Sequence, residues 1–266
     1  MASDARWSGT VGIAGSESQP PGAIPRAQDQ LFRGAGGARA RYSALIVGKP
    51  GWGALLKYEL VVLLSQSVPG ALGLALRKVC YKWLLGRCGR NVIFGQNVVL
   101  RHPHKIEIGD DVVIDDQCLI DAKGDTNRGI RIGSGVFIGR NTILSCKNGD
   151  IDIADGANLG FNCEVFSASR VRIGKDTLVA AYTYLVGGDH TLVDRARPVI
   201  DQGRRSVGID VGEGAWIGAG STILDGVTVG DRGVIGAGAV VREAVRAGAT
   251  VVGIPAREVD LPKPSP

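Results

Sequence analysis

The sequence predicts an all-β chain wound as a parallel β-helix, and two observations support this fold class. From about Phe94 onward an aliphatic residue recurs every six positions, as at Ile132, Ile138 and Leu144. The residues that interrupt this period fall after every third repeat. A six-residue period fits neither a lone amphipathic helix nor an alternating strand, and it is typical of a hexapeptide β-helix.

Each hexapeptide is expected to form a short strand and a corner, and three of them make one coil of about 18 residues that rises about 4.8 Å. The aliphatic residue points inward and stacks on its equivalent in the next coil, so the core is built by stacking. Glycine often follows it, near a tight corner where a Cβ would clash. The other triplets are Ile108, Ile114 and Ile120; Ile153, Leu159 and Val165; Ile173, Val179 and Leu185; Val211, Ile217 and Ile223; and Val229, Ile235 and Val241, with Phe94 and Leu100 ending an imperfect first one.

The interruptions indicate where the insertions leave the coil. All of them follow the third strand of a triplet, so they are expected at one corner of the prism. A β-sandwich with glycine turns would instead space its strands by about 8–12 residues. The longest break predicts an excursion loop over residues 186–210. The steps are eight residues from Leu100 to Ile108, twelve from Ile120 to Ile132, nine from Leu144 to Ile153, eight from Val165 to Ile173 and twenty-six from Leu185 to Val211.

The remaining sequence divides into three segments. Residues 1–52 are rich in Gly, Ala, Ser, Pro and Arg, which predicts a disordered extension; no apolar run follows the early Arg6, so no signal peptide is indicated. Residues 53–87 are largely apolar but contain Pro69, which predicts two short helices joined near this proline. The β-helix is assigned to residues 88–249 and a C-terminal tail to residues 250–266.

Two roles are open for residues 53–87. The helices could cap the open end of the β-helix, which would otherwise expose strand edges. Alternatively they could lie on an anionic membrane surface, with Tyr81 and Trp83 at the level of the headgroups. A membrane span needs about 20 apolar residues, and this segment is shorter. The net charge of +5 is compatible with both roles, and no aromatic-basic module for nucleic acid is present.

Cysteines and histidines give little sign of a metal or disulfide site. The five cysteines are scattered singly, which is typical of a reduced cytoplasmic protein. His102, His104 and His190 are the three histidines. In a β-helix His102 and His190 would lie several coils apart, about 20 Å along the axis, so no metal is expected.

The C-terminal repeats resemble a known family. The stretch "WIGAG", followed by "GVTVG", "GVIGAGAVV" and "VGIPAREV", is similar to hexapeptide-repeat acyltransferases, above all to O-acetyltransferases of exopolysaccharide and O-antigen synthesis such as those of colanic acid. Galactoside and streptogramin acetyltransferases share the pattern. The resemblance covers residues 88–259. It implies a left-handed coil, acetyl-CoA as co-substrate, and a homotrimer with active sites between neighbouring prisms.

The resemblance also implies a role for His190, at the base of the excursion loop. Its position matches the catalytic base of the family. Imidazole changes protonation near neutral pH, so it can accept a proton from a hydroxyl that attacks a thioester. Asp189 and Asp194 are candidates to orient the imidazole ring.

Further site residues follow from the same resemblance. Gly218 and Ala219 are expected to offer backbone N–H groups to the developing oxyanion and, with Ala237, to line the pantetheine arm of acetyl-CoA. Trp216 is expected beside the acceptor cleft. Arg257 matches a position that binds the nucleotide phosphates. Arg242 is a second candidate for them, displaced by one residue from a lysine in the family.

These observations predict an acetyl-CoA-dependent O-acetyltransferase that acts on a sugar hydroxyl in polysaccharide or glycolipid biosynthesis, in the cytoplasm or at the inner face of the membrane. Transfer to the amine of an amino sugar or to a small antibiotic is one alternative, and a non-catalytic β-helix scaffold is another. An acceptor-binding Asn of galactoside acetyltransferase has no match near Gly160, so a galactoside acceptor is not implied. The sequence does not identify the acceptor or the acyl chain length, because variable loops bind sugars.

Overall fold

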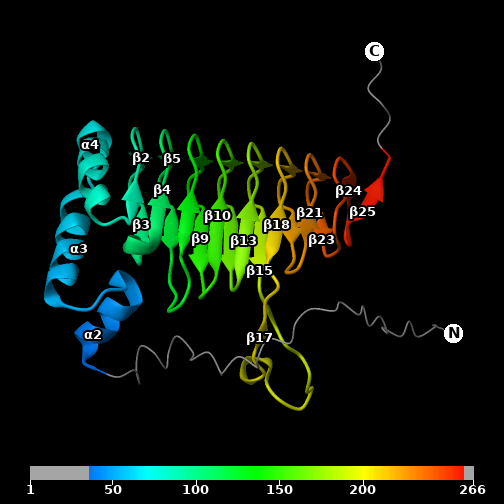
Figure 1. The fold of residues 1–266 in the computed structure, drawn as a ribbon, viewed down its shortest axis with the longest axis horizontal. Helices are drawn as coiled ribbons and strands as arrows, with labels where there is room; N and C mark the ends of the chain where they lie inside the picture. Colours follow the sequence, from blue (N-terminus) through cyan, green and yellow to red (C-terminus); the bar gives the residue numbers. More distant parts are fainter. Residues whose placement is uncertain (1–35, 261–266) are drawn as a thin grey trace.

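The structure, a computed structural model, describes residues 36–260 and shows a solenoid of parallel strands. Seven coils each contribute one short strand to each of three sheets, called sheets A, B and C, and one further partial coil adds a parallel strand to sheet B alone (Figure 1). The parallel β-helix predicted from the six-residue period is therefore confirmed. Its left hand stays the prediction that the resemblance gives.

Strand bounds follow the sequence triplets. Sheet A contains β1 (Arg87–Cys88), β4 (Ile106–Ile108), β7 (Ile130–Ile132), β10 (Asp150–Ile153), β13 (Arg170–Ile173), β18 (Ile209–Val211) and β21 (Thr228–Val229). Sheet B contains β2 (Ile93–Phe94), β5 (Val113–Ile114), β8 (Phe137–Ile138), β11 (Asn158–Leu159), β14 (Leu178–Val179), β19 (Trp216–Ile217), β22 (Val234–Ile235), β24 (Thr250–Val252) and β25 (Arg257–Val259). Sheet C contains β3 (Val99–Arg101), β6 (Leu119–Asp121), β9 (Ile143–Cys146), β12 (Glu164–Ser167), β15 (Tyr184–Gly187), β20 (Thr222–Ile223) and β23 (Val240–Val241).

The core is the stack of predicted aliphatic residues. In sheet B, Leu159 lies in register with Ile138 on one side and Val179 on the other, and all three are fully buried. Burying each such side chain stabilises the fold by about 1.5–3 kcal/mol. The outward residues are partly or fully exposed, as Phe137 and Asn158 show.

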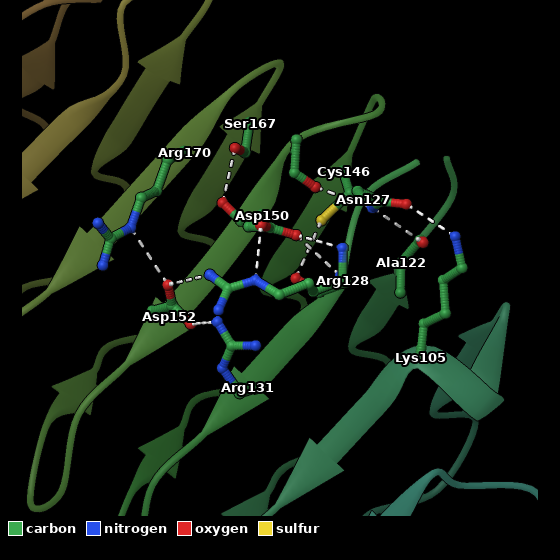
Figure 2. Close-up of polar contacts among 12 residues, drawn as sticks. Lys105, Ala122, Asn127, Arg128, Arg131, Cys146, Asp150, Asp152, Ser167 and Arg170 are labelled. Atoms are coloured by element: carbon green, nitrogen blue, oxygen red, sulfur yellow. Dashed lines mark hydrogen bonds and ion pairs between the residues drawn. The ribbon is translucent and has the colours of Figure 1, made fainter. Parts of the chain in front are cut away.

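All insertions leave the solenoid between sheet C and sheet A, as the spacing predicts. Residues 122–129 form one of them, and Asn127 holds it in place. Its Oδ1 accepts from Lys105 Nζ at 2.9 Å, and its Nδ2 donates to the Gly149 carbonyl at 2.9 Å (Figure 2). The excursion from β15 to β18 is the longest, and it stands out from the same corner (Figure 1).

The outer face of sheet A carries a ladder of alternating charges. Asp152 lies in register with Arg131 on one side and Arg172 on the other. Its carboxylate forms ion pairs with Arg131 and with Arg170, whose Nε is 3.3 Å from Asp152 Oδ2 (Figure 2). Opposite charges in facing positions stabilise strand pairing. From the first coil to the sixth the ladder reads Arg87, Glu107, Arg131, Asp152, Arg172 and Asp210.

Helices cover the first coil (Figure 1). They are α2 (Ala38–Tyr42), η1 (Ser43–Val47), α3 (Trp52–Ser65), α4 (Gly70–Cys80) and η2 (Tyr81–Trp83). The predicted short helical segment is thus confirmed, with Pro69 between its two longer helices. The Tyr58 hydroxyl donates to the Leu100 carbonyl at 2.9 Å, and the Tyr81 hydroxyl to the Val98 carbonyl at 2.8 Å. We call residues 38–83 the cap. No helix within residues 36–260 is long and apolar enough to cross a membrane.

Two histidines fasten the start of the cap. His102 Nε2 donates to the Ala44 carbonyl at 2.9 Å, and the His102 backbone N–H donates to the Ile46 carbonyl at 2.8 Å. Burial lowers the pKa of His102. Burial, with the charges of Lys49, His102 and Lys105, lowers the pKa of His104 to about 4. Both imidazoles are therefore neutral at neutral pH, as the close packing under the cap requires.

Two sequence predictions need correction. The disordered extension is predicted to reach residue 52, but residues 38–47 form helical turns because their carbonyls bond to the first coil. The tail is predicted from residue 250, but β24 continues sheet B, where Val251 pairs with Ile235, and β25 turns back antiparallel on it. Residues 1–35 and 261–266, the rest of these two segments, lie outside the described residues.

Candidate functional site

The excursion loop folds as a hairpin that presents His190 to solvent. Strand β16 (Asp189–His190) follows β15 directly and pairs antiparallel with β17 (Arg204–Arg205), with His190 opposite Arg204. The turn η4 (Val199–Asp201) lies between the two strands. The side chain of His190 is exposed, so it is free to meet a substrate.

A carboxylate of the next coil fixes the base of the hairpin. Asp225, in the corner after β20, accepts from the backbone N–H groups of Val207 at 2.7 Å and Gly208 at 2.8 Å. The Ser206 hydroxyl donates to the Gly187 carbonyl at 3.0 Å. Sequence reasoning missed Asp225. The sequence did contain a signal for it. Asp225 comes two positions after Ile223, the third inward residue of its coil, at a corner where no insertion follows.

Neither predicted acidic partner orients the imidazole ring. Asp189 Oδ1 accepts from the backbone N–H of His190 at 2.7 Å, and Asp194 Oδ1 accepts from the Ala196 backbone N–H at 2.8 Å. Within residues 36–260 the ring of His190 makes no hydrogen bond or ion pair. Aspartates in loops commonly bond to nearby backbone N–H groups in this way, and the orienting role of Asp189 or Asp194 stays a prediction.

The base of the hairpin is rich in positive charge. Lys147 lies at the same corner two coils before the hairpin. Its pKa is lowered by partial burial and by the charges of Arg204 and Lys123. Arg204 is also the ladder partner of His190. Arg204 therefore brings positive charge opposite His190, and Lys147 adds to the positive charge around Arg204. No sequence signal points to this cluster, because its members lie far apart along the chain.

The residues predicted to line the pantetheine arm stack at the corner between sheets B and C. The Gly238 backbone N–H donates to the Ala219 carbonyl at 2.8 Å, which joins the two successive corners. A Cβ at Gly218 would lie 2.5 Å from the Ala237 backbone nitrogen, so this close approach requires glycine. Gly218 donates its N–H to the Ile235 carbonyl at 2.7 Å and therefore cannot bind an oxyanion. The Ala219 N–H has no partner among the described residues.

Trp216 lies on the outer face of sheet B, and its side chain is 53% exposed. It is in register with Leu178 and Val234, so these three residues form an apolar column. The two predicted phosphate-binding arginines meet at one carboxylate. Arg242 Nε is 3.4 Å and Arg257 Nη1 is 3.8 Å from Glu243 Oε1.

The structure brings the predicted cofactor residues together in two groups, Gly218 with Ala219 and Ala237, and Arg242 with Arg257. Within residues 36–260 no hydrogen bond or ion pair joins His190 to either group. His190 follows a strand of sheet C, whereas Ala219 follows a strand of sheet B, so the two lie at different corners of the prism. In a single chain the predicted base and the predicted pantetheine groove therefore do not face one another.

The described residues hold no cluster of potential metal ligands, and the thiol of Cys118 is unsuited to nucleophilic chemistry. Within residues 36–260 no three His, Cys, Asp or Glu side chains are placed to hold a metal ion. His102 follows the first coil and His190 the fifth. Cys118 is buried in the core, and burial raises the pKa of its thiol to about 12, which disfavours the reactive thiolate.

Comparisons with known proteins agree with this architecture. Residues 208–243 match the family described as bacterial transferase hexapeptide (six repeats), which confirms the resemblance inferred from the repeats. The chain is 32% identical to "Probable acetyltransferase Rv3034c" of Mycobacterium tuberculosis over 130 residues, 49% of this chain and 43% of that protein. It is 43% identical to "Nodulation protein L" of Rhizobium meliloti over 108 residues, 41% of this chain and 58% of that protein. The chain spans about half the length of the curated relatives it matches.

Two solved structures share the fold. One is the polysialic-acid-specific acetyltransferase NeuO, with a TM-score of 0.52 and 22% identity over 65% of this chain and 80% of the other. The second is the polysialic acid O-acetyltransferase OatWY, with a TM-score of 0.51 and 21% identity over 66% and 85% of the two chains. At this identity both show the β-helix fold.

Proposed function

We propose that this protein is an acetyl-CoA-dependent acetyltransferase that transfers the acetyl group to a sugar hydroxyl. One observation carries the proposal. The hairpin that presents His190 leaves the solenoid immediately before the repeats matched by the transferase family, residues 208–243, and Asp225 within these repeats holds its base. The histidine and the transferase repeats thus form one structural unit.

The relatives support the reaction class. One curated relative is named a probable acetyltransferase, and the two solved structures named above are described as acetyltransferases of polysialic acid. The positive charge of Arg204 opposite His190, with Lys147 near Arg204, supports a further step. It favours an acceptor sugar that carries a carboxylate or phosphate.

In the proposed reaction His190 accepts the proton of the acceptor hydroxyl as the oxygen attacks the thioester carbonyl. General bases of this kind contribute about 10²–10⁴-fold to the rate. The tetrahedral intermediate collapses to the ester, and the proton passes from His190 to the departing thiolate. The free N–H of Ala219 is the donor available to the oxyanion. Arg242 and Arg257 bind the nucleotide phosphates in place of Glu243.

A second copy of the chain completes this site. The His190 hairpin and the Ala219 corner do not face one another within one prism, so the hairpin of one copy reaches the groove of its neighbour. The apolar column of Trp216, Leu178 and Val234 supplies a surface for such packing. A closed threefold assembly gives every copy the same environment, so the proposal includes a homotrimer with three sites.

The test is a panel of neutral and acidic sugars with acetyl-CoA, followed by release of free thiol. The His190→Ala variant should stay folded and lose about 10²-fold or more of its rate on the best acceptor. Thr191→Ala is the matched control, because it alters the neighbouring position and leaves the base in place. Hydroxylamine treatment of the product distinguishes an ester, which it cleaves, from an amide. A folded His190→Ala protein within a few-fold of the wild-type rate would remove the base from the mechanism.

A further inference from the structure

The outward side of α3 is apolar. Tyr58, Val61 and Ser65 face the solenoid and are buried. Trp52, Leu56, Leu60 and Leu63 recur at helical spacing on the other side, with exposed fractions of 62%, 60%, 55% and 80%. A helix that covers a core from one side normally turns a polar face to water. This helix turns large apolar side chains to both sides.

The same character continues through α4 and η2. Leu72, Val79 and Trp83 are 67%, 56% and 59% exposed. Single apolar residues on a surface are ordinary, but a group of large ones marks an interaction surface. We call this group the cap face: Trp52, Leu56, Leu60, Leu63, Leu64, Leu72, Leu74, Val79 and Trp83.

The charge around the cap face selects its partner. Residues 36–86 contain seven basic residues and one acidic residue, and the acidic one, Glu59, accepts a hydrogen bond from the Tyr42 hydroxyl at 2.6 Å. Lys57, Lys78 and Lys82 are exposed. A second copy of the same face would bring these like charges together, whereas anionic lipid complements them.

We infer that the cap face docks on an anionic lipid bilayer, with α3 and α4 lying in the plane of the membrane surface. The 14 residues of α3 extend about 21 Å, less than the roughly 30 Å of the hydrocarbon core. Such helices lie in the interface with their apolar side chains toward the acyl chains. Trp52 begins α3 and Trp83 ends η2, and tryptophan prefers the headgroup level.

The geometry of the solenoid agrees with this mode of docking. The helices occupy the end of the solenoid beside the first coil, and the coils extend away from them (Figure 1). Nothing of the His190 hairpin is needed for contact with lipid. The inference is therefore independent of the proposed acetyl transfer, and each can fail without the other.

The test is cosedimentation of the full chain with vesicles of phosphatidylcholine, with and without about a third of phosphatidylserine. The triple variant Leu56→Gln, Leu60→Gln, Leu63→Gln should bind the anionic vesicles at least about 10-fold more weakly than the wild type, because apolar burial scales with area. Salt at about 0.5 M should weaken wild-type binding, because it screens the basic residues. The matched control carries Leu192→Gln, Val193→Gln and Ile200→Gln on the hairpin, at exposures of 57%, 84% and 58%, and should bind as the wild type does.

A second measurement covers the case in which the triple variant fails to fold. Tryptophan emission should shift to the blue when anionic vesicles are added to the wild type. The conservative double variant Trp52→Phe, Trp83→Phe should lose the shift, and Trp216→Phe should retain it. The inference is overturned by equal binding of the triple variant and the wild type. It is also overturned if the wild type does not bind the anionic vesicles. In that case, a lower molar mass of the triple variant than of the wild type in light scattering would show that a second copy covers the cap face.

Discussion

A buried arginine joins the cap to the first coil, and its replacement tests how firmly the cap is attached. Arg77 on α4 is 1% exposed. Its Nε donates to the Phe94 carbonyl at 2.9 Å, and its Nη1 donates to the carbonyls of Val68 at 2.7 Å and Ser65 at 3.0 Å. Within residues 36–260 no carboxylate pairs with it. Arg77→Met keeps an unbranched side chain and removes all the donors.

The size of the effect follows from these contacts. A hydrogen bond to a charged group contributes about 1.5–3 kcal/mol, and an acceptor left unpaired in a buried place costs about 1–3 kcal/mol. Three carbonyls would lose their partner. Loss of the buried charge also removes its desolvation cost, which offsets part of the sum. We therefore expect Arg77→Met to lower the free energy of unfolding by about 2–4 kcal/mol.

The assay is urea unfolding followed by tryptophan emission, together with limited proteolysis of the cap. The variant should unfold at lower urea, and cleavage within residues 38–83 should become faster. Arg90→Met is the control, because Arg90 pairs with Asp110 at the surface with 86% of its side chain exposed; it should unfold as the wild type does. If Arg77→Met unfolds within about 0.5 kcal/mol of the wild type, less than the cost of a single unpaired buried carbonyl, the guanidinium does not hold the cap.

Two further predictions concern the cap and the hairpin. The pKa values of His102 and His104 are lowered in the folded chain, so the unfolded chain binds more protons below about pH 6.5. The free energy of unfolding should therefore be greatest above that pH and fall toward pH 4. Urea midpoints at pH 7.5 and 4.5 measure this loss of stability, and His104→Asn should make the loss smaller. Asp225→Ala should leave the N–H groups of residues 207 and 208 unpaired, so hydrogen exchange in the hairpin should become faster while the coils keep their protection. Unchanged exchange there would mean that Asp225 does not fix the hairpin.

Most of the solenoid could be predicted from the sequence because its contacts repeat. Within its coil an inward residue such as Leu159 lies six positions from the inward residues on either side, Ile153 and Val165. Each coil resumes this period after its insertion, so a local period encodes a long-range stack. The cap could be predicted only in part. The bonds that order residues 38–47 join Ala44 and Ile46 to His102, and no period links positions so far apart. The charge ladder of sheet A was readable in principle, since it occupies one fixed position in each triplet.

The candidate site shows the same division. The break in the period locates the hairpin, and the resemblance selects His190 within it. The partners of the hairpin were not predictable, because Asp225 and Lys147 lie on other coils. The expected oxyanion donor Gly218 lies at the predicted corner, but its N–H belongs to the ladder between coils. The free amide of this corner belongs to Ala219, the second donor that the resemblance implies.

The solenoid fixes the distance between the two segments with proposed functions. Each coil contacts only its neighbours in such a fold. The stacking of the coils that separate the cap from the hairpin therefore does not depend on either segment. The cap packs on the first coil and the hairpin follows the fifth, a separation of four steps or about 19 Å at about 4.8 Å per coil. A substitution within one coil would repack that coil and leave the separation between cap and hairpin unchanged. An added or deleted coil would change this separation by the rise of one coil. The number of coils, more than any single residue, therefore sets how far the proposed base stands from the proposed membrane surface.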